Sequence, residues 1–156
     1  MVLALHPDLA EIAFLLGTWR GEGEGEWPGS DPFRFGEELA FEHVGDDYLL
    51  HSQRSWSLEN DEPIHLERGF LRSAGPGRVE LVLAHPLGMA EVAEGTVADH
   101  VIDVRSTTVA LAGTASGVTE LRRRIELDRD ELRYELHMAM RETPVTSHIR
   151  SRLRRV

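Results

Sequence analysis

The sequence of 156 residues contains no cysteine, and this absence limits the chemistry open to the protein. Disulfide exchange, zinc–thiolate sites and cysteine-held iron–sulfur clusters are excluded, because each needs a cysteine sulfur. A chain of this length can bury a substantial core without covalent staples. We therefore expect a single domain over residues 1–156, in a reducing compartment of which the cytoplasm is the simplest.

Long apolar runs and lysine are also missing. The first sixteen residues are apolar but lack a basic leader and carry His6, Asp8 and Glu11, which argues against a signal peptide. No later run approaches the roughly 18 apolar residues of a membrane span. All 17 basic residues are arginine and the formal net charge is −10, which repels nucleic acid and anionic membranes. The expectation is a soluble protein with neither as a partner.

The chain consists of one short helical pattern followed by alternating segments. Residues 6–16 place apolar side chains at helical spacing, and from Thr18 onward turn residues separate about ten segments of period two. The expected strands cover residues 18–27, 33–44, 48–58, 63–72, 78–84, 89–98, 101–108, 118–127, 131–140 and 146–155. These features predict an all-β protein, a ten-stranded antiparallel up-and-down β-barrel with one short N-terminal helix. Closure removes exposed sheet edges and leaves room for a ligand.

Alternation within the segments predicts an apolar interior. In residues 33–44 the apolar side chains share one face with His43, and in residues 131–140 they lie opposite His137. Glu37 and Glu67 are the exceptions, and we expect each to pair with an arginine. No acid/base pair held in a dry pocket is expected.

Three glycines, Gly21, Gly23 and Gly25, alternate along the first expected strand. They are neither followed by a helix nor spaced as a dinucleotide or phosphate-binding loop. Glycine in a strand marks a bulge, a bend or a close approach of another group. We expect a sharply coiled first strand with neighbours pressed against it.

The eight histidines are the remaining candidates for binding chemistry. A lone histidine in a strand is ordinarily a surface or hydrogen-bonded residue. Haem changes this expectation, because it needs one strong axial ligand and an apolar wall. The residues by themselves do not decide between His43, His65 and His148.

The glycine series belongs to a set of motifs that resembles the nitrobindin family. Gly17-x-Trp19-x-Gly21-x-Gly23-x-Gly25 is followed by Trp27-Pro28, and further matches run in order through nearly the whole chain. They cover residues 33–43, 53–56, 63–72, 91–95 and 144–153. Nitrobindins are haem proteins with a ten-stranded barrel related in shape to the fatty-acid-binding proteins.

The resemblance implies roles for three histidines. His148, in a Pro-x-x-x-His-Ile context, would be the catalytic residue and the proximal ligand of ferric haem b through its iron. His65, in a Pro-x-His-x-Glu-x-Gly-Phe segment, would lie on the distal side, and His43 matches another histidine of the pocket region. The implied activity is isomerisation of peroxynitrite to nitrate, with binding of nitric oxide. The same analogy allows a homodimer.

Two features depart from simple expectation. The family commonly has Tyr-Pro-Thr where this chain has Trp27-Pro28-Gly29, so a hydroxyl contact near the haem edge is missing unless Ser30 supplies it. In addition, strict alternation puts His148 on the face of the arginines at positions 150, 152 and 154. Resemblance and alternation agree if His148 lies at the barrel mouth, with an arginine near a haem propionate, or if a β-bulge shifts the register after it.

Two other classes of function stay open. A non-haem carrier of fatty acid or another small apolar ligand would place an arginine inside the barrel, and Arg54 or Arg124 could serve. A purely structural β domain would bind neither haem nor lipid.

Overall fold

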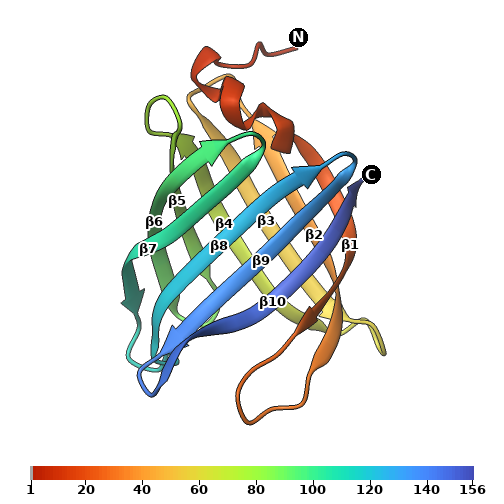
Figure 1. The fold of residues 1–156 in the computed structure, drawn as a ribbon, viewed down its shortest axis with the longest axis vertical. Coiled ribbons are helices and arrows are strands. Elements are labelled where there is room, and N and C mark those ends of the chain that lie inside the picture. Colours follow the sequence, from red (N-terminus) through yellow and green to blue (C-terminus); the bar gives the residue numbers. More distant parts are fainter. Residues whose placement is uncertain (1) are drawn as a thin grey trace.

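Ten strands and one short helix follow one another in the computed structural model, which describes residues 2–156. Every strand pairs antiparallel with its neighbours in sequence, and β1 also pairs with β10, which closes the barrel (Figure 1). The bounds are β1 (Gly17–Gly25), β2 (Phe33–His43), β3 (Tyr48–Ser57), β4 (Pro63–Ser73), β5 (Arg78–His85), β6 (Met89–Ala98), β7 (Val101–Leu111), β8 (Val118–Asp128), β9 (Glu131–Met140) and β10 (Thr143–Arg155). The predicted barrel is confirmed, and each predicted strand end lies within three residues of the observed one.

The short helix η1 (Pro7–Leu15) covers one end of the barrel (Figure 1). It is a 3₁₀-helix, and its buried residues Leu9, Ile12 and Leu15 recur every third position, which matches three residues per turn. The carbonyl oxygen of Leu15 accepts a 2.8 Å hydrogen bond from the Trp19 indole, tying the helix to β1. No helix within residues 2–156 is long and apolar enough to cross a membrane.

The glycines of β1 allow close packing, as predicted. A Cβ at Gly21 would lie 2.0 Å from the backbone carbonyl oxygen of Arg152, and one at Gly25 would lie 2.1 Å from the Phe33 ring. Any larger residue would therefore push β10 or the Phe33 ring away from β1.

The interior differs in polarity between its two ends. Near η1 it is filled by apolar side chains such as Leu39, Phe41 and Leu153. Towards the opposite end, where β4 and β10 begin, the buried side chains include charged and polar groups. These are Glu37, Gln53, Ser55, Glu67, His85, Glu91, Arg123 and Ser151, whereas the buried His51 pairs with Phe41 nearer the helix. The expectation of an apolar interior therefore holds beneath the helix, whereas in the open half apolar core residues such as Met89 and Val118 share the interior with buried charged groups.

Candidate functional site

His148 lies at a β-bulge near the start of β10. Ser147 pairs with His137 of β9, and Ile149 pairs with the very next residue of β9, Leu136, so His148 is the extra residue. Beyond the bulge Ser151 is buried, whereas the arginines at positions 150, 152 and 154 are exposed. At a bulge, the side chain of the extra residue need not follow the in-and-out alternation of its neighbours. A β-bulge, one of the two arrangements considered from the sequence, is thus observed at His148.

The backbone after β1 holds the half-buried His148 imidazole. Its Nδ1 atom lies 3.0 Å from the carbonyl oxygen of Glu26, and the Glu26 N–H donates a 2.9 Å hydrogen bond to the His148 carbonyl oxygen. The Trp27 ring meets the imidazole edge-on at 5.5 Å between centroids, and the Phe33 ring lies 6.5 Å away. Because Nδ1 donates its hydrogen to a carbonyl, the Nε2 lone pair is available for a ligand.

Strand direction places the three predicted histidines at two ends of the barrel. His148 lies near the start of β10 and His65 near the start of β4, both at the end opposite η1 (Figure 1). Three strands, β1 to β3, separate β10 from β4, so the two histidines stand on different walls of the open end. His43 is the last residue of β2 and lies at the helix end. The structure brings His65 and His148 to one end and leaves His43 at the other.

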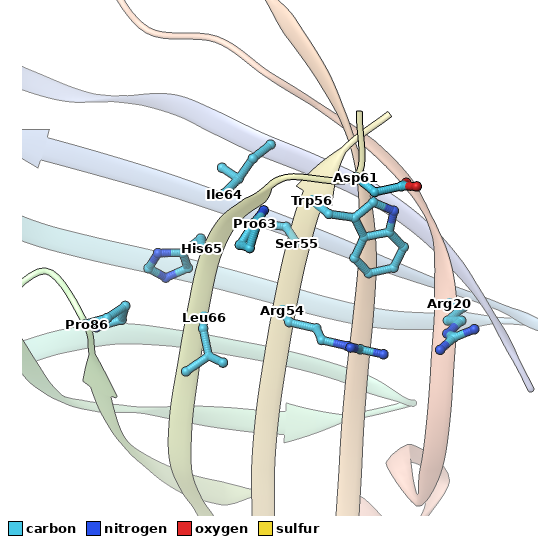
Figure 2. A pocket seen from close by; sticks show the side chains of 10 residues that line it. All are labelled: Arg20, Arg54, Ser55, Trp56, Asp61, Pro63, Ile64, His65, Leu66 and Pro86. Carbon is cyan, nitrogen blue, oxygen red and sulfur yellow. The ribbon is translucent and has the colours of Figure 1, made fainter. Parts of the chain in front are cut away.

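Two hollows border the open end. One, of about 230 Å³, is lined by His148 and Arg150 together with residues of the β1–β2 connection. The other, of about 580 Å³, has His65 in its wall beside Trp56 and Pro86 (Figure 2). Both histidines of this end are therefore accessible to a small ligand.

A buried ion-pair network occupies the polar half of the interior and centres on Arg123. Its guanidinium donates to Glu91 at 2.6 Å, to Glu67 at 3.1 Å and to the Tyr134 hydroxyl at 2.9 Å. The expected pairing of Glu67 with an arginine is confirmed. The signal for Arg123 was present in the sequence, because it shares its strand face with the apolar residues Leu121 and Ile125.

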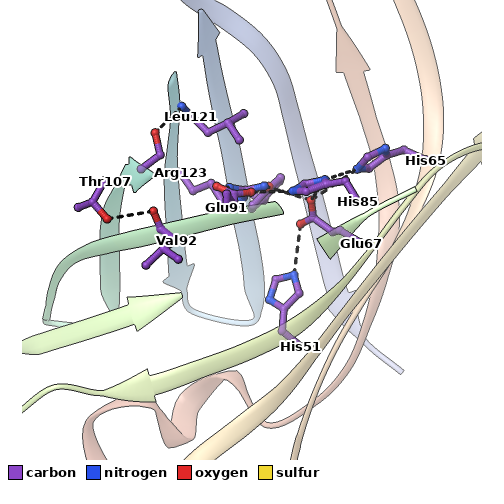
Figure 3. A network of polar contacts seen from close by, with 11 residues as sticks. His51, His65, Glu67, His85, Glu91, Val92, Thr107, Leu121 and Arg123 are labelled. Carbon is purple, nitrogen blue, oxygen red and sulfur yellow. Dashed lines mark hydrogen bonds and ion pairs between the residues drawn. The ribbon is translucent and has the colours of Figure 1, made fainter. Parts of the chain in front are cut away.

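Three histidines extend this network (Figure 3). His85 places Nε2 2.8 Å from Glu91 Oε1 and Nδ1 3.2 Å from His65 Nε2, while His51 Nε2 lies 3.3 Å from Glu67 Oε1. Burial by itself would raise the pKa of Glu67, but the Arg123 charge and the His51 hydrogen bond outweigh it and hold that pKa well below its usual value. The network is therefore built around ionised carboxylates.

Glu37 behaves differently from Glu67. It is fully buried on β2, and its hydrogen-bond donor is the Gln53 amide at 3.1 Å rather than the expected arginine. Burial raises its pKa from the ordinary 4.5 to about 7, with Gln53 opposing part of the shift. Sequence analysis singled out Glu37 on the apolar face but expected an arginine partner, and it did not anticipate a carboxyl whose pKa lies near neutral pH.

Comparison with known proteins identifies the relatives of this barrel. Residues 8–155 match a family described as a THAP4-like, heme-binding beta-barrel domain. The chain belongs to this haem-binding barrel family. The resemblance to nitrobindins is thereby confirmed.

Proteins named peroxynitrite isomerase and one solved structure match this chain over almost their full length. Peroxynitrite isomerase 2 of Mycobacterium marinum is 43% identical over 155 residues, 97% of this chain and 96% of that protein. Peroxynitrite isomerase of Nocardia farcinica is 43% identical over 157 residues, 98% and 94% of the two chains. The crystal structure of Rv2717c from M. tuberculosis superposes with a TM-score of 0.91 at 39% identity, covering 98% of this chain and 99% of that one.

Proposed function

We propose that this protein binds ferric haem b through His148 and isomerises peroxynitrite to nitrate. The observation that carries the proposal is the His148 imidazole, whose Nδ1 is held by the Glu26 carbonyl so that Nε2 is free. Histidines that bind metals usually donate their other ring hydrogen to a carbonyl or carboxylate in this way. Membership of a haem-binding family and relatives named peroxynitrite isomerase support the same assignment.

Bound haem would supply a ferric iron that acts as a Lewis acid on peroxynitrite during its rearrangement to nitrate and that also binds nitric oxide. The residues of this chain would orient the haem and shield it. The bulge aims His148, and the rings of Trp27 and Phe33 pack beside the imidazole and limit water around it. Arg150 borders the same hollow, and its guanidinium can hold a haem propionate.

His65 would supply a polar contact from the facing wall. Its side chain borders the larger hollow at the same end as His148, and its Nε2 is already directed at His85. A contact to the bound oxyanion would therefore come from Nδ1, because Nε2 donates to His85, and Nδ1 donates when the imidazole carries both hydrogens. We leave His43 out of the proposed site because it lies at the helix end.

The alternative of a fatty-acid carrier has less support. Arg54 and Arg124, the two arginines considered for the interior, are exposed, and Arg123 takes the interior position instead. Arg123 is already paired with Glu67 and Glu91. A bound fatty-acid carboxylate would have to break one of these pairs and leave a buried charge unpaired.

The assignment is tested by adding hemin to haem-free protein and recording the absorption spectrum. We expect a Soret band in the wild type that shifts when nitric oxide is added, and its loss in His148→Ala. His137→Ala is the matched control, because His137 lies on the neighbouring strand and pairs with Ser147 beside the bulge. Stopped-flow decay of peroxynitrite, with nitrate and nitrite counted separately, reports the isomerase activity. An unchanged spectrum in His148→Ala would contradict the assignment of the ligand.

A further inference from the structure

A second group of donor atoms meets inside the barrel, away from the β10 bulge (Figure 3). His65 Nε2 lies 3.2 Å from His85 Nδ1 and 3.5 Å from Glu67 Oε2, and His85 Nδ1 lies 3.4 Å from the same oxygen. In a tetrahedral site with metal–ligand bonds of about 2.0–2.1 Å, neighbouring ligand atoms are about 3.3 Å apart. The three donors thus already have the spacing of one face of such a site.

Surrounding groups fix the orientation of these donors. His85 Nε2 lies 2.8 Å from Glu91 Oε1, so this nitrogen carries the hydrogen and the Nδ1 lone pair faces His65 and Glu67. The other oxygen of Glu67 contacts His51 Nε2 at 3.3 Å. Carboxylate–histidine hydrogen bonds of this kind commonly orient the residues that bind a metal.

The charges around the cluster favour a cation. Arg123 pairs with both Glu67 and Glu91, so two carboxylates face one guanidinium. Each carboxylate also contacts a histidine, Glu67 with His51 at 3.3 Å and Glu91 with His85 at 2.8 Å. The negative charge that Arg123 leaves uncompensated lies in a place shielded from water, where an added cation is attracted strongly.

One ligand reaches solvent while the others do not. The His65 side chain is 23% exposed and borders the 580 Å³ hollow, whereas Glu67 and His85 are almost completely buried. His65 thus marks a route from solvent to the cluster, and a position beside it can be filled by water.

We propose that His65, Glu67 and His85 form a binding site for a divalent transition-metal ion, for which Zn²⁺ is the matching probe. Two imidazoles and one carboxylate are a known zinc ligand set that leaves a fourth position for water. The incoming ion displaces the hydrogen between His65 Nε2 and His85 Nδ1, and that proton is released to solvent. The site uses neither His148 nor haem, and it shares only His65 with the proposed haem pocket, so we test it in haem-free protein.

Isothermal titration of haem-free wild-type protein with zinc sulfate tests this proposal. We expect about one Zn²⁺ per chain, and binding at least about tenfold weaker in His65→Gln, which removes the ligand nearest to solvent. His137→Gln is the matched control and should bind Zn²⁺ like the wild type. His148→Ala should also keep its Zn²⁺ while losing the Soret band, which separates this site from the haem site.

X-ray absorption spectroscopy of the zinc-loaded wild type identifies the ligands of the bound Zn²⁺ without the use of a variant. Two imidazoles in the first coordination sphere are expected. Absence of Zn²⁺ uptake, equal uptake by His65→Gln and wild type, or a coordination sphere without two imidazoles would each overturn the proposal and leave the cluster as a proton-bridged network.

Discussion

The Nδ1 atom of His148 lies 3.0 Å from the carbonyl oxygen of Glu26, so the backbone just beyond β1 orients the ring that projects from the β10 bulge. The Glu26 N–H returns a 2.9 Å hydrogen bond to the His148 carbonyl oxygen. Together these two contacts hold the His148 ring and backbone against Glu26, the residue just beyond β1. Haem binding should therefore respond to changes in the backbone and packing around Gly25, and not only to changes of the ligand itself.

Gly25→Ala should weaken haem binding. The new Cβ would lie 2.1 Å from the Phe33 ring, which must move, and Phe33 is one of the two rings packed near His148. Overpacking of this kind costs about 1–3 kcal/mol, and a loss of that size in binding free energy is about a 5- to 150-fold rise in the Kd for hemin. Gly113→Ala is the control, because nothing lies within 4 Å of a Cβ there. Equal hemin affinity of Gly25→Ala and wild type would contradict the proposed role of this packing.

Gly29→Thr should destabilise the protein although it restores the family's usual residue. Ser30 donates to the Trp27 carbonyl oxygen at 3.0 Å, Pro28 follows Trp27, and Gly29 has φ of +83°, which is the pattern of a type II turn. A β-branched residue is strained there by about 1–3 kcal/mol. Chemical denaturation should show this loss, with Gly29→Asn as a milder control because asparagine tolerates positive φ. Equal midpoints for the two variants would show that the turn rearranges without cost.

Arg123→Met should lower the free energy of unfolding by about 3–5 kcal/mol, because it leaves Glu67 and Glu91 as buried carboxylates without their cation. Arg124→Met, one residue along the same strand, removes pairs with Asp103 and Glu126, and the three side chains are 45%, 52% and 35% exposed. Its cost should be below about 1 kcal/mol. Urea unfolding of both variants distinguishes the two, and similar losses would argue against the central role of Arg123.

Glu37→Gln should change the pH dependence of stability. Between pH 4.5 and about 7 the folded Glu37 carboxyl keeps its proton while the unfolded one has lost it, so its contribution to stability falls as the pH rises through this window. Above about pH 7 the Glu37 carboxyl is ionised in both the folded and the unfolded protein, so the free-energy cost of burying its charge no longer changes with pH. Glutamine carries no titrating group, so the stability of Glu37→Gln relative to wild type should rise across the window by at most about 3 kcal/mol.

The neighbouring Glu38 provides the control for this experiment. Its side chain pairs with Arg20 and Arg54 near the surface, and their hydrogen bonds outweigh the effect of burial and lower its pKa. Its contribution to stability is therefore lost as the pH falls, which is the opposite sign. Urea titrations of wild type, Glu37→Gln and Glu38→Gln at several pH values measure both effects, and parallel curves for the two variants would contradict the assignment to Glu37.

The sequence by itself determined the strands, the turns and the closure of the barrel. Period-two alternation and turn residues are local signals, so strands such as β6 (Met89–Ala98) and β9 (Glu131–Met140) were predicted with their observed bounds. The close packing at Gly21 and Gly25 was also predicted, because glycine inside a strand usually marks a bulge, a bend or a place where another group approaches the backbone closely. The family motifs added His148 and His65 as candidates, and their roles as haem residues stay predictions.

Only the tertiary structure decided what the interior contains and how His148 is oriented. Glu67 of β4, Glu91 of β6 and Arg123 of β8 meet because the closed barrel brings inward positions of distant strands together, and each carboxylate is tolerated inside because the same guanidinium contacts it. Alternation alone put His148 on the arginine face, whereas the bulge frees it from that face and the Glu26 carbonyl orients it. Such contacts depend on strand register and on partners far away in the chain. The local pattern of residues predicts neither the register nor these partners.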